Sequence, residues 1–304
     1  MKFSKELMQD KKTQHSKIGN FVSRSIRNKW AEEQENTLRE ISPYPISYDI
    51  HTFSPNISNL NFTEYEYTEL LGGIWVNPQC LEITCRMIQD ASLENNEHLT
   101  SDQIKNILGD KYELVPISDK WKKAKKIIFL PGHNLLPLSS HESVSQLMFN
   151  NDDIFLKPHP ITFDRIVESF GREFGWDRVI ERDVSGHSLL EQCEEIYTTS
   201  ASEMAITGIL LDKKVFNISN FLNEGYGAYY ALNRLIFNSK NITEAKLKIG
   251  NVFQSEWSGI CFPHHTNIKQ RFENFFNKSL EYREKFKPLS PPWHPKLKIQ
   301  DETN

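Results

Sequence analysis

The sequence predicts an α/β fold, with a Rossmann-type parallel-sheet domain in the C-terminal half and a smaller α/β domain before it. First, 304 residues are enough for two domains. Second, 38% hydrophobic and 25% charged residues are typical of a folded globular chain rather than a disordered one. Third, apolar strand-like segments alternate with helix-like segments after residue 126. This alternation favours a parallel sheet covered by helices on both faces.

Five short apolar segments in this region are predicted strands. They are KIIFLPGH, NDDIFLKPHP, DRVIERDV, EEIYTTSAS and KKVFNIS. The intervening segments ITFDRIVESFGREFG, GHSLLEQC and SEMAITGILLD have the length and apolar pattern of helices. Residues 268–285 predict a final amphipathic helix, and the Pro-rich tail after Pro288 is predicted to be irregular.

The first 40 residues are polar and helix-prone. Phe21, Val22, Ile26 and Trp30 recur at helical spacing among basic residues. We favour a helix packed on its own domain; the alternative is a peripheral membrane contact through residues 18–30.

Strand-like and helix-like segments also follow this N-terminal region. ISYDIHTF and LLGGIWVNP are strand-like, and LEITCRMIQDA is helical. We therefore divide the chain into a helical extension (1–40), a small α/β domain (41–122), a Rossmann-like domain (123–285) and an irregular tail (286–304).

Several classes of protein are disfavoured by composition. No run of about 18 apolar residues predicts a membrane span, and the N-terminus lacks the apolar core of a secretory signal. Four cysteines without CxxC spacing predict reduced structural thiols, so a cytoplasmic location is expected. A net charge of −4 argues against a polyanionic partner. The basic stretch KWKKAKK at 120–126 is interpreted as a solvated charge run.

The predicted ligand site lies where the strands end, because open parallel sheets bind ligands outside the carboxyl ends of their strands. Four polar groups follow the predicted strands there: Gly132-His133, Pro158-His159-Pro160, Gly186-His187-Ser188 and Thr198-Thr199-Ser200-Ala201-Ser202. His159 is held between two prolines, so it is a candidate to meet a leaving phosphate, with Lys157 beside it. His133, His187 and Ser188 are further candidates for ligand contacts.

The hydroxyl cluster has two interpretations. A helix N-terminus with Thr199, Ser200 and Ser202 suits a phosphate group. Alternatively, Ser200-x-x-Glu203 and Ser188-x-x-Glu191 are helix-capping boxes that need no ligand. Both hold if Ser200 caps the helix and leaves Thr199 and Ser202 for the ligand.

At these residues the sequence resembles bacterial capsule and surface-polysaccharide glycosyltransferases of the GT-B type. This group includes Kdo transferases, sialyl- and polysialyltransferases and, more distantly, teichoic acid glycerophosphotransferases. The matching features are Lys157-Pro158-His159-Pro160 and the Ser/Thr cluster followed by Glu203 and Gly208, across residues 126–220. In those families the corresponding motifs contact the phosphate of a cytidine nucleotide donor, which implies that role for His159, Ser200 and Ser202.

No DxD-type sequence lies at the predicted site, because Asp152-Asp153 precedes a strand, at the opposite edge, so neither a metal ion nor a cofactor is expected. The resemblance implies a GT-B-like fold and a glycosyltransferase. It would move a sugar from a nucleotide-sugar donor, with a CMP-linked donor favoured, to a glycan acceptor. The donor-binding set is His133, Lys157, His187, Ser188, Thr199, Ser200, Ser202 and Glu203. The families also use an acidic base before glycine; Glu69 is the closest candidate, ahead of Asp49. Alternatives are a phage-type transferase acting on DNA bases through Lys122, Lys123, Lys125 and Lys126, a phosphoglycerol transferase, and a non-catalytic nucleotide-sugar-binding protein.

Overall fold

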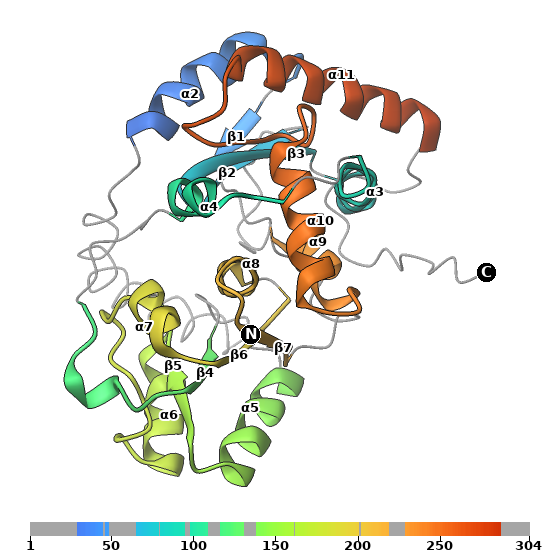
Figure 1. The fold of residues 1–304 in the computed structure, drawn as a ribbon. Coiled ribbons are helices and arrows are strands. Elements are labelled where there is room, and N and C mark those ends of the chain that lie inside the picture. The colour runs from blue at the N-terminus through green and yellow to red at the C-terminus, as the bar shows by residue number, and fades with distance from the viewer. Residues whose placement is uncertain are drawn as a thin grey trace. The chain divides into compact units, whose positions relative to one another are not determined.

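The computed structural model describes residues 29–44, 46–48, 65–78, 80–94, 98–108, 116–130, 138–160, 162–200, 202–218 and 229–286 (Figure 1). These residues form two compact units. The parallel-sheet unit holds the described residues within 110–199 and 213–220. The mixed-sheet unit holds those within 27–109, 200–212 and 221–304. Each unit is described by itself.

A four-stranded parallel sheet is the centre of the parallel-sheet unit. Its strands are β4 (Lys126–Phe129), β5 (Ile154–Lys157), β6 (Glu195–Thr198) and β7 (Lys214–Asn217), in the spatial order β5-β4-β6-β7. Four of the five predicted strands are therefore confirmed. The fifth, DRVIERDV, is reduced to a single parallel bridge between Val179 and Leu156.

Helices α5 (Leu138–Asn150) and α6 (Asp164–Phe174) pack on one face of this sheet. Ile128 and Leu156 contribute to that core from the strands, and Met148 and Phe170 from the helices. The opposite face carries Phe155, whose ring lies 6.1 Å from that of Trp121 in the short 3-10 helix η2 (Asp119–Trp121). The predicted helices α6 and α7 (Gly186–Gln192) are confirmed, whereas α5 was not predicted.

The mixed-sheet unit is built around a second four-stranded sheet. Its strands are β1 (Ile46–Tyr48), β2 (Tyr65–Leu70), β3 (Gly73–Pro78) and β8 (Ile260–Cys261), in the order β1-β2-β3-β8. Its helices are α2 (Lys29–Ile41), α3 (Leu81–Ala91), α4 (Ser101–Ile107), α8 (Glu203–Leu210), α9 (Tyr230–Phe237), α10 (Ile242–Gln254) and α11 (Ile268–Phe286). Only β1 and β2 run parallel; the other two pairings are antiparallel.

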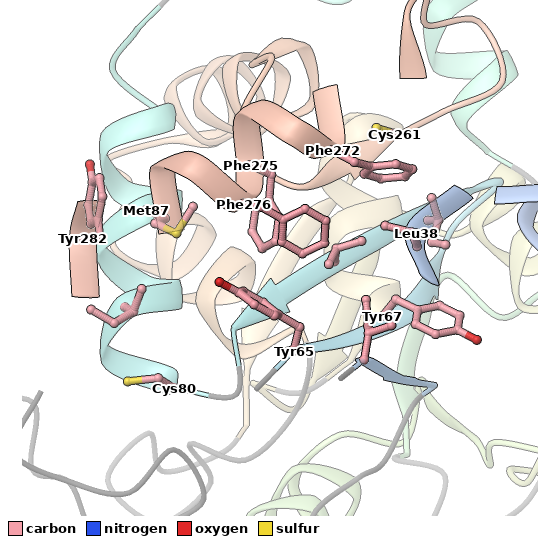
Figure 2. Packing of buried hydrophobic residues seen from close by; sticks show 14 residues of the cluster. Leu38, Tyr65, Tyr67, Cys80, Met87, Cys261, Phe272, Phe275, Phe276 and Tyr282 are labelled. Carbon is pink, nitrogen blue, oxygen red and sulfur yellow. The ribbon is translucent and has the colours of Figure 1, made fainter. Parts of the chain in front are cut away.

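Aromatic packing dominates the core of this unit (Figure 2). Tyr65 of β2 meets Phe276 of α11 edge-to-face, with ring centroids 5.0 Å apart. Leu38 of α2 and Met87 of α3 are buried in the same cluster. The final helix, predicted from its amphipathic pattern, is thereby confirmed as α11, which packs on the sheet through its apolar side.

The predicted α/β class is confirmed. The two units, however, do not correspond to an N-terminal part and a C-terminal part of the chain. Helices α8 and α11, predicted within the Rossmann-like part 123–285, group with residues 27–109. The mixed-sheet unit is therefore assembled from distant parts of the chain. The roles assigned to the predicted domains, and the GT-B arrangement of two domains, stay predictions.

The predicted membrane-contact segment 18–30 lies almost entirely outside the described residues, which begin at Lys29 of α2. Within the part of the chain that the structure describes, no helix combines the length and apolarity needed to cross a bilayer.

The basic stretch 120–126 makes contacts within its own unit. Lys122 pairs with Asp119 at 2.6 Å, and Lys126 pairs with Asp153 at 2.8 Å. The Lys125 Nζ donates to the carbonyl oxygen of Gln192 at 3.1 Å. These local pairings fit the interpretation as a surface charge run and give no support to a nucleic-acid groove.

Candidate functional site

The last row of the parallel sheet carries the polar side chains expected at a ligand edge. Phe129 of β4 lies opposite Lys157 of β5 on one side and Thr198 of β6 on the other. Thr198 in turn lies opposite Asn217 of β7. The row therefore runs Lys157, Phe129, Thr198, Asn217, at the carboxyl ends of all four strands. Because residues in register point to the same side, Lys157 and Thr198 face the same side of the sheet.

This edge also contains the reversal in strand order. The chain passes from β4 to β5 in one direction and then returns to place β6 on the other side of β4. In open α/β sheets the ligand crevice lies outside the carboxyl ends at such a reversal. Thr198 ends one of the two strands involved, and Thr199 follows it. His133 would follow the other strand, but it lies within 131–137, outside the described residues.

Within the part of the chain that the structure describes, two neighbouring hydroxyls at this position have no hydrogen-bond partner. Thr198 is 0% and Thr199 2% exposed, and the Oγ1 atom of neither makes a hydrogen bond within the described structure. Burying a hydroxyl without a partner costs about 1–3 kcal/mol. Unpaired buried polar groups are uncommon in folded proteins, and a water or ion that would pair with them is one recognised cause. These hydroxyls therefore make this edge a candidate binding position.

Lys157 is buried at the same edge, with only 3% of its surface exposed. Its Nζ donates to the carbonyl oxygens of Pro158, at 2.7 Å, and Arg182, at 3.0 Å. Burial lowers the pKa of this ammonium group to about 7, against the opposing effect of the nearby Asp183 carboxylate. An ammonium carries three donors, so two backbone contacts leave one donor for a further acceptor.

His159 follows β5 and is half-buried. Its carbonyl oxygen accepts from the backbone N–H of Thr162 at 2.9 Å, which closes a turn around Pro160. Since β5 and β6 are separated only by β4, the strand ends before His159 and Thr199 are about 10 Å apart. The structure thus brings Lys157, His159 and Thr199 to one edge of one sheet, as predicted from the sequence.

His187 and Ser188 lie in the first turn of α7, but the predicted capping box there is wrong. The N-cap is Ser185, whose hydroxyl accepts from the backbone N–H of Ser188 at 3.2 Å. The helix begins earlier than the Ser188-x-x-Glu191 pattern indicated, because Ser185 is equally suited to cap and precedes Gly186. His187 and Ser188 are both half-buried.

The capping box predicted at Ser200-x-x-Glu203 is also wrong. Helix α8 is capped by Ser202, which accepts from the backbone N–H of Met204 at 3.2 Å. The Glu203 carboxylate instead accepts from the backbone N–H of Leu71, at the turn between β2 and β3. The division between the two units falls between Thr199 and Ser200, so Ser200, Ser202 and Glu203 belong to the mixed-sheet unit.

Glu69 lies in that same unit, near the end of β2 and close to the turn that Glu203 holds. Its side chain is half-buried, and its carbonyl oxygen accepts from the hydroxyl of Tyr229 at 2.7 Å. The structure therefore brings the predicted base Glu69 and the predicted donor-binding residue Glu203 to one hairpin. Asp49 lies outside the described residues.

Sequence reasoning singled out Thr199 but gave no ligand role to Thr198 or Asn217. Their place in the last row depends on strand register, which the sequence does not specify. The sequence interpretation correctly placed Asp152 and Asp153 before a strand. They precede β5, at the edge opposite the candidate site. Among the described residues no cluster of His, Cys, Asp and Glu forms a metal-binding group.

Comparisons with known proteins return little. No protein-family profile matches the chain, and no curated protein matches it. Among solved structures the chain is similar to S. aureus MnaA in complex with UDP, with a TM-score of 0.29 and 13% identity. The likeness covers 46% of this chain and 45% of MnaA, so it spans less than half of either. At this TM-score it supports no conclusion about fold or activity.

Proposed function

We propose that the parallel-sheet unit binds the phosphate groups of a nucleotide sugar and that the protein is a glycosyltransferase. The observation that carries the proposal is the pair of buried, unpaired hydroxyls of Thr198 and Thr199 at the carboxyl edge of the sheet. Phosphate oxygens accept hydrogen bonds, so they would satisfy both hydroxyls. The resemblance of Lys157–Pro160 and the Ser/Thr cluster to GT-B motifs supports the choice of a nucleotide-sugar donor, with CMP-linked donors first.

The roles proposed for the site follow from its chemistry. Lys157 and His159 supply hydrogen-bond donors to the leaving phosphate, where negative charge develops as the sugar–phosphate bond breaks. Glu69 accepts the proton of the acceptor hydroxyl. The sugar is transferred to that oxygen, and the electron pair of the broken bond stays on the departing phosphate. No step needs a metal ion or a cofactor, and a glycan is the proposed acceptor.

We expect Thr199→Val to weaken nucleotide binding while leaving the unliganded protein as stable or more stable. Valine has the same shape and removes a buried hydroxyl that has no partner, so no native hydrogen bond is lost. The affinity for the matching nucleotide should fall roughly 10–100-fold, the cost of one hydrogen bond to a charged group. Thermal unfolding with CMP, CDP, UDP or GDP, one at a time, measures both effects, since saturation at 100 times Kd adds about 2.7 kcal/mol.

Thr84→Val is the matched control, because the buried Thr84 hydroxyl is satisfied by the carbonyl oxygens of Pro78 and Cys80 at 3.1 and 3.0 Å. This variant should lose about 1 kcal/mol of stability and keep nucleotide binding. If no nucleotide stabilises the wild-type protein, the proposed function is wrong. If Thr199→Val binds as tightly as the wild type, the phosphate position is wrong.

We expect Glu69→Gln to slow transfer about 10²–10⁴-fold with nucleotide affinity unchanged. Glutamine has nearly the same size but cannot accept the proton, and general-base catalysis contributes about 10²–10⁴-fold to rate. Release of nucleotide from the matching donor sugar, in the presence and absence of glycan acceptors, is the measurement. Glu66→Gln, in the same strand, is the control and should keep full activity. Equal activity of Glu69→Gln and the wild type would remove Glu69 from the mechanism.

A further inference from the structure

Lys157 is a buried lysine without a counter-ion in the part of the chain that the structure describes. Its side chain is 3% exposed, and its Nζ donates to the carbonyl oxygens of Pro158 and Arg182. No carboxylate among the described residues forms an ion pair with it. Buried charges in proteins are paired, or the group gives up its charge. Lys157 is therefore either neutral or in need of an anion from outside the described residues.

The two hydrogen bonds of Lys157 suit the neutral amine. A neutral amine has two N–H donors and one lone pair, so the carbonyl oxygens of Pro158 and Arg182 use both donors. Protonation converts the lone pair into a third N–H donor. That donor has no acceptor among the described residues. The charged form thus carries an unpaired charge and an unused donor as long as no ligand is bound.

The segment that holds Lys157 is itself anchored by two charged side chains. The Arg182 guanidinium pairs with Asp164, the first residue of α6. The Glu181 carboxylate accepts from the indole N–H of Trp121. Because both side chains are engaged, the Arg182 carbonyl oxygen is held against Lys157. The ammonium group therefore keeps its place at the carboxyl edge of the sheet.

The charges around Lys157 do not restore its ammonium form. Burial lowers its pKa to about 7. Asp183 and Glu181 act in the opposite direction, but both are exposed, so water and salt weaken their effect, and Arg182 adds to the lowering. On the side of β4 the neighbour is the apolar Phe129. Above pH 7 the lysine is therefore mostly neutral in the absence of a ligand.

We propose that Lys157 takes up a proton when a phosphate binds at this edge of the sheet, so that ligand and proton bind together. A phosphate oxygen accepts the third N–H and supplies the negative charge that the described residues do not. Lys157 and Thr198 belong to the same row of strand ends and to the same unit. This inference rests on the proposed function and adds to it a dependence of nucleotide affinity on pH.

The test counts the protons that the protein takes up on binding. The probe is whichever of CMP, CDP, UDP and GDP stabilises the protein, used at pH 8, where its phosphate is fully ionised. Titration calorimetry in two buffers of different ionisation enthalpy gives the number of protons. We expect about 0.9 proton per nucleotide, the neutral fraction of an amine with a pKa of about 7. The Kd should rise roughly eightfold from pH 7.5 to pH 8.5 for the same reason.

Two variants assign the proton to Lys157. Lys157→Met should bind the nucleotide more weakly, without proton uptake and with a Kd independent of pH in this range. Lys157→Arg keeps its charge at every pH, so it should also bind without proton uptake, and it serves if the methionine variant does not fold. Lys125→Met is the control, because the exposed Lys125 also donates to a backbone carbonyl oxygen, and it should keep the wild-type proton uptake.

His159 is the other group of this edge that could take up a proton, so His159→Gln completes the set. Proton uptake that persists in Lys157→Met and disappears in His159→Gln would assign the proton to His159 and overturn the inference. Nucleotide binding by the wild type without proton uptake overturns the inference and leaves the proposed function intact. Failure of the wild type to bind any of the four nucleotides overturns both.

Discussion

Gly259→Ala should destabilise the mixed-sheet unit by roughly 3–5 kcal/mol, the largest single-residue effect that we expect. Gly259 has a φ of +80°, a backbone conformation that alanine adopts only at a cost. A Cβ atom there would lie 2.1 Å from the Val76 carbonyl oxygen and 2.8 Å from the Phe275 ring. The Val76 backbone N–H donates to the Gly259 carbonyl oxygen at 2.8 Å, so the two backbones cannot separate without losing that bond.

Urea unfolding followed by circular dichroism measures this loss. Gly175→Ala is the control, because Gly175 also has a positive φ, +91°, but a Cβ there meets only the Asp177 side chain. That carboxylate can rotate away, so Gly175→Ala should lose only the cost of its backbone conformation, about 1–3 kcal/mol. Equal losses of unfolding free energy in the two variants would mean that the Val76 carbonyl oxygen adds nothing to the cost of a Cβ atom at Gly259.

The second large effect is a pH dependence of stability that Lys157 creates. Its pKa is lowered by burial to about 7 in the folded protein, against an ordinary value of 10.5. Between these two pH values the unfolded chain keeps the proton and the folded chain loses it, so unfolding takes up a proton. Stability therefore rises with pH in this range, and the contribution of Lys157 from pH 7 to pH 9 is about 2 kcal/mol.

Lys157→Met should remove this rise, because methionine fills the same space without titrating. The measurement is the free energy of unfolding at several pH values between 6 and 10, taken as the difference between variant and wild type. Lys125→Met is the control, since the exposed Lys125 also donates to a backbone carbonyl oxygen. If the free energy of unfolding changes with pH in the same way in Lys157→Met and in the wild type, Lys157 is not buried as a neutral amine.

The parallel sheet was predictable because its strands are nearly continuous apolar segments separated by helix-like ones. The position of the candidate site followed from the same pattern, since polar residues after each strand must share one edge. The mixed sheet was less predictable. Strand β2, YEYTEL, alternates polar and apolar residues and was not assigned, and β8 has only two residues. Both are stabilised by pairing with β3, a contact that neither segment specifies by itself.

The capping residues show a second limit of prediction from the sequence. Ser185 and Ser188 both suit a helix N-cap, as do Ser200 and Ser202, and the tertiary contacts decide between them. Asn233 holds the carbonyl oxygens of Ser200 and Ser202 from 31 or more residues away in the chain. Such a contact leaves no local signature in the sequence. Thr198 was included only as a member of the hydroxyl cluster, because strand register, rather than residue type, places it in the last row of the sheet.

The discontinuous mixed-sheet unit imposes an order on folding during synthesis. Tyr65 and Phe275 meet in its core, yet they are more than two hundred residues apart in the chain. The strands and helices of the parallel-sheet unit lie between Lys126 and Asn217, so they emerge from the ribosome well before α11. Contacts between distant residues form slowly because loop closure must precede them. The earlier strands of the mixed-sheet unit must therefore wait, with apolar surface uncovered, until translation of the final helix is complete.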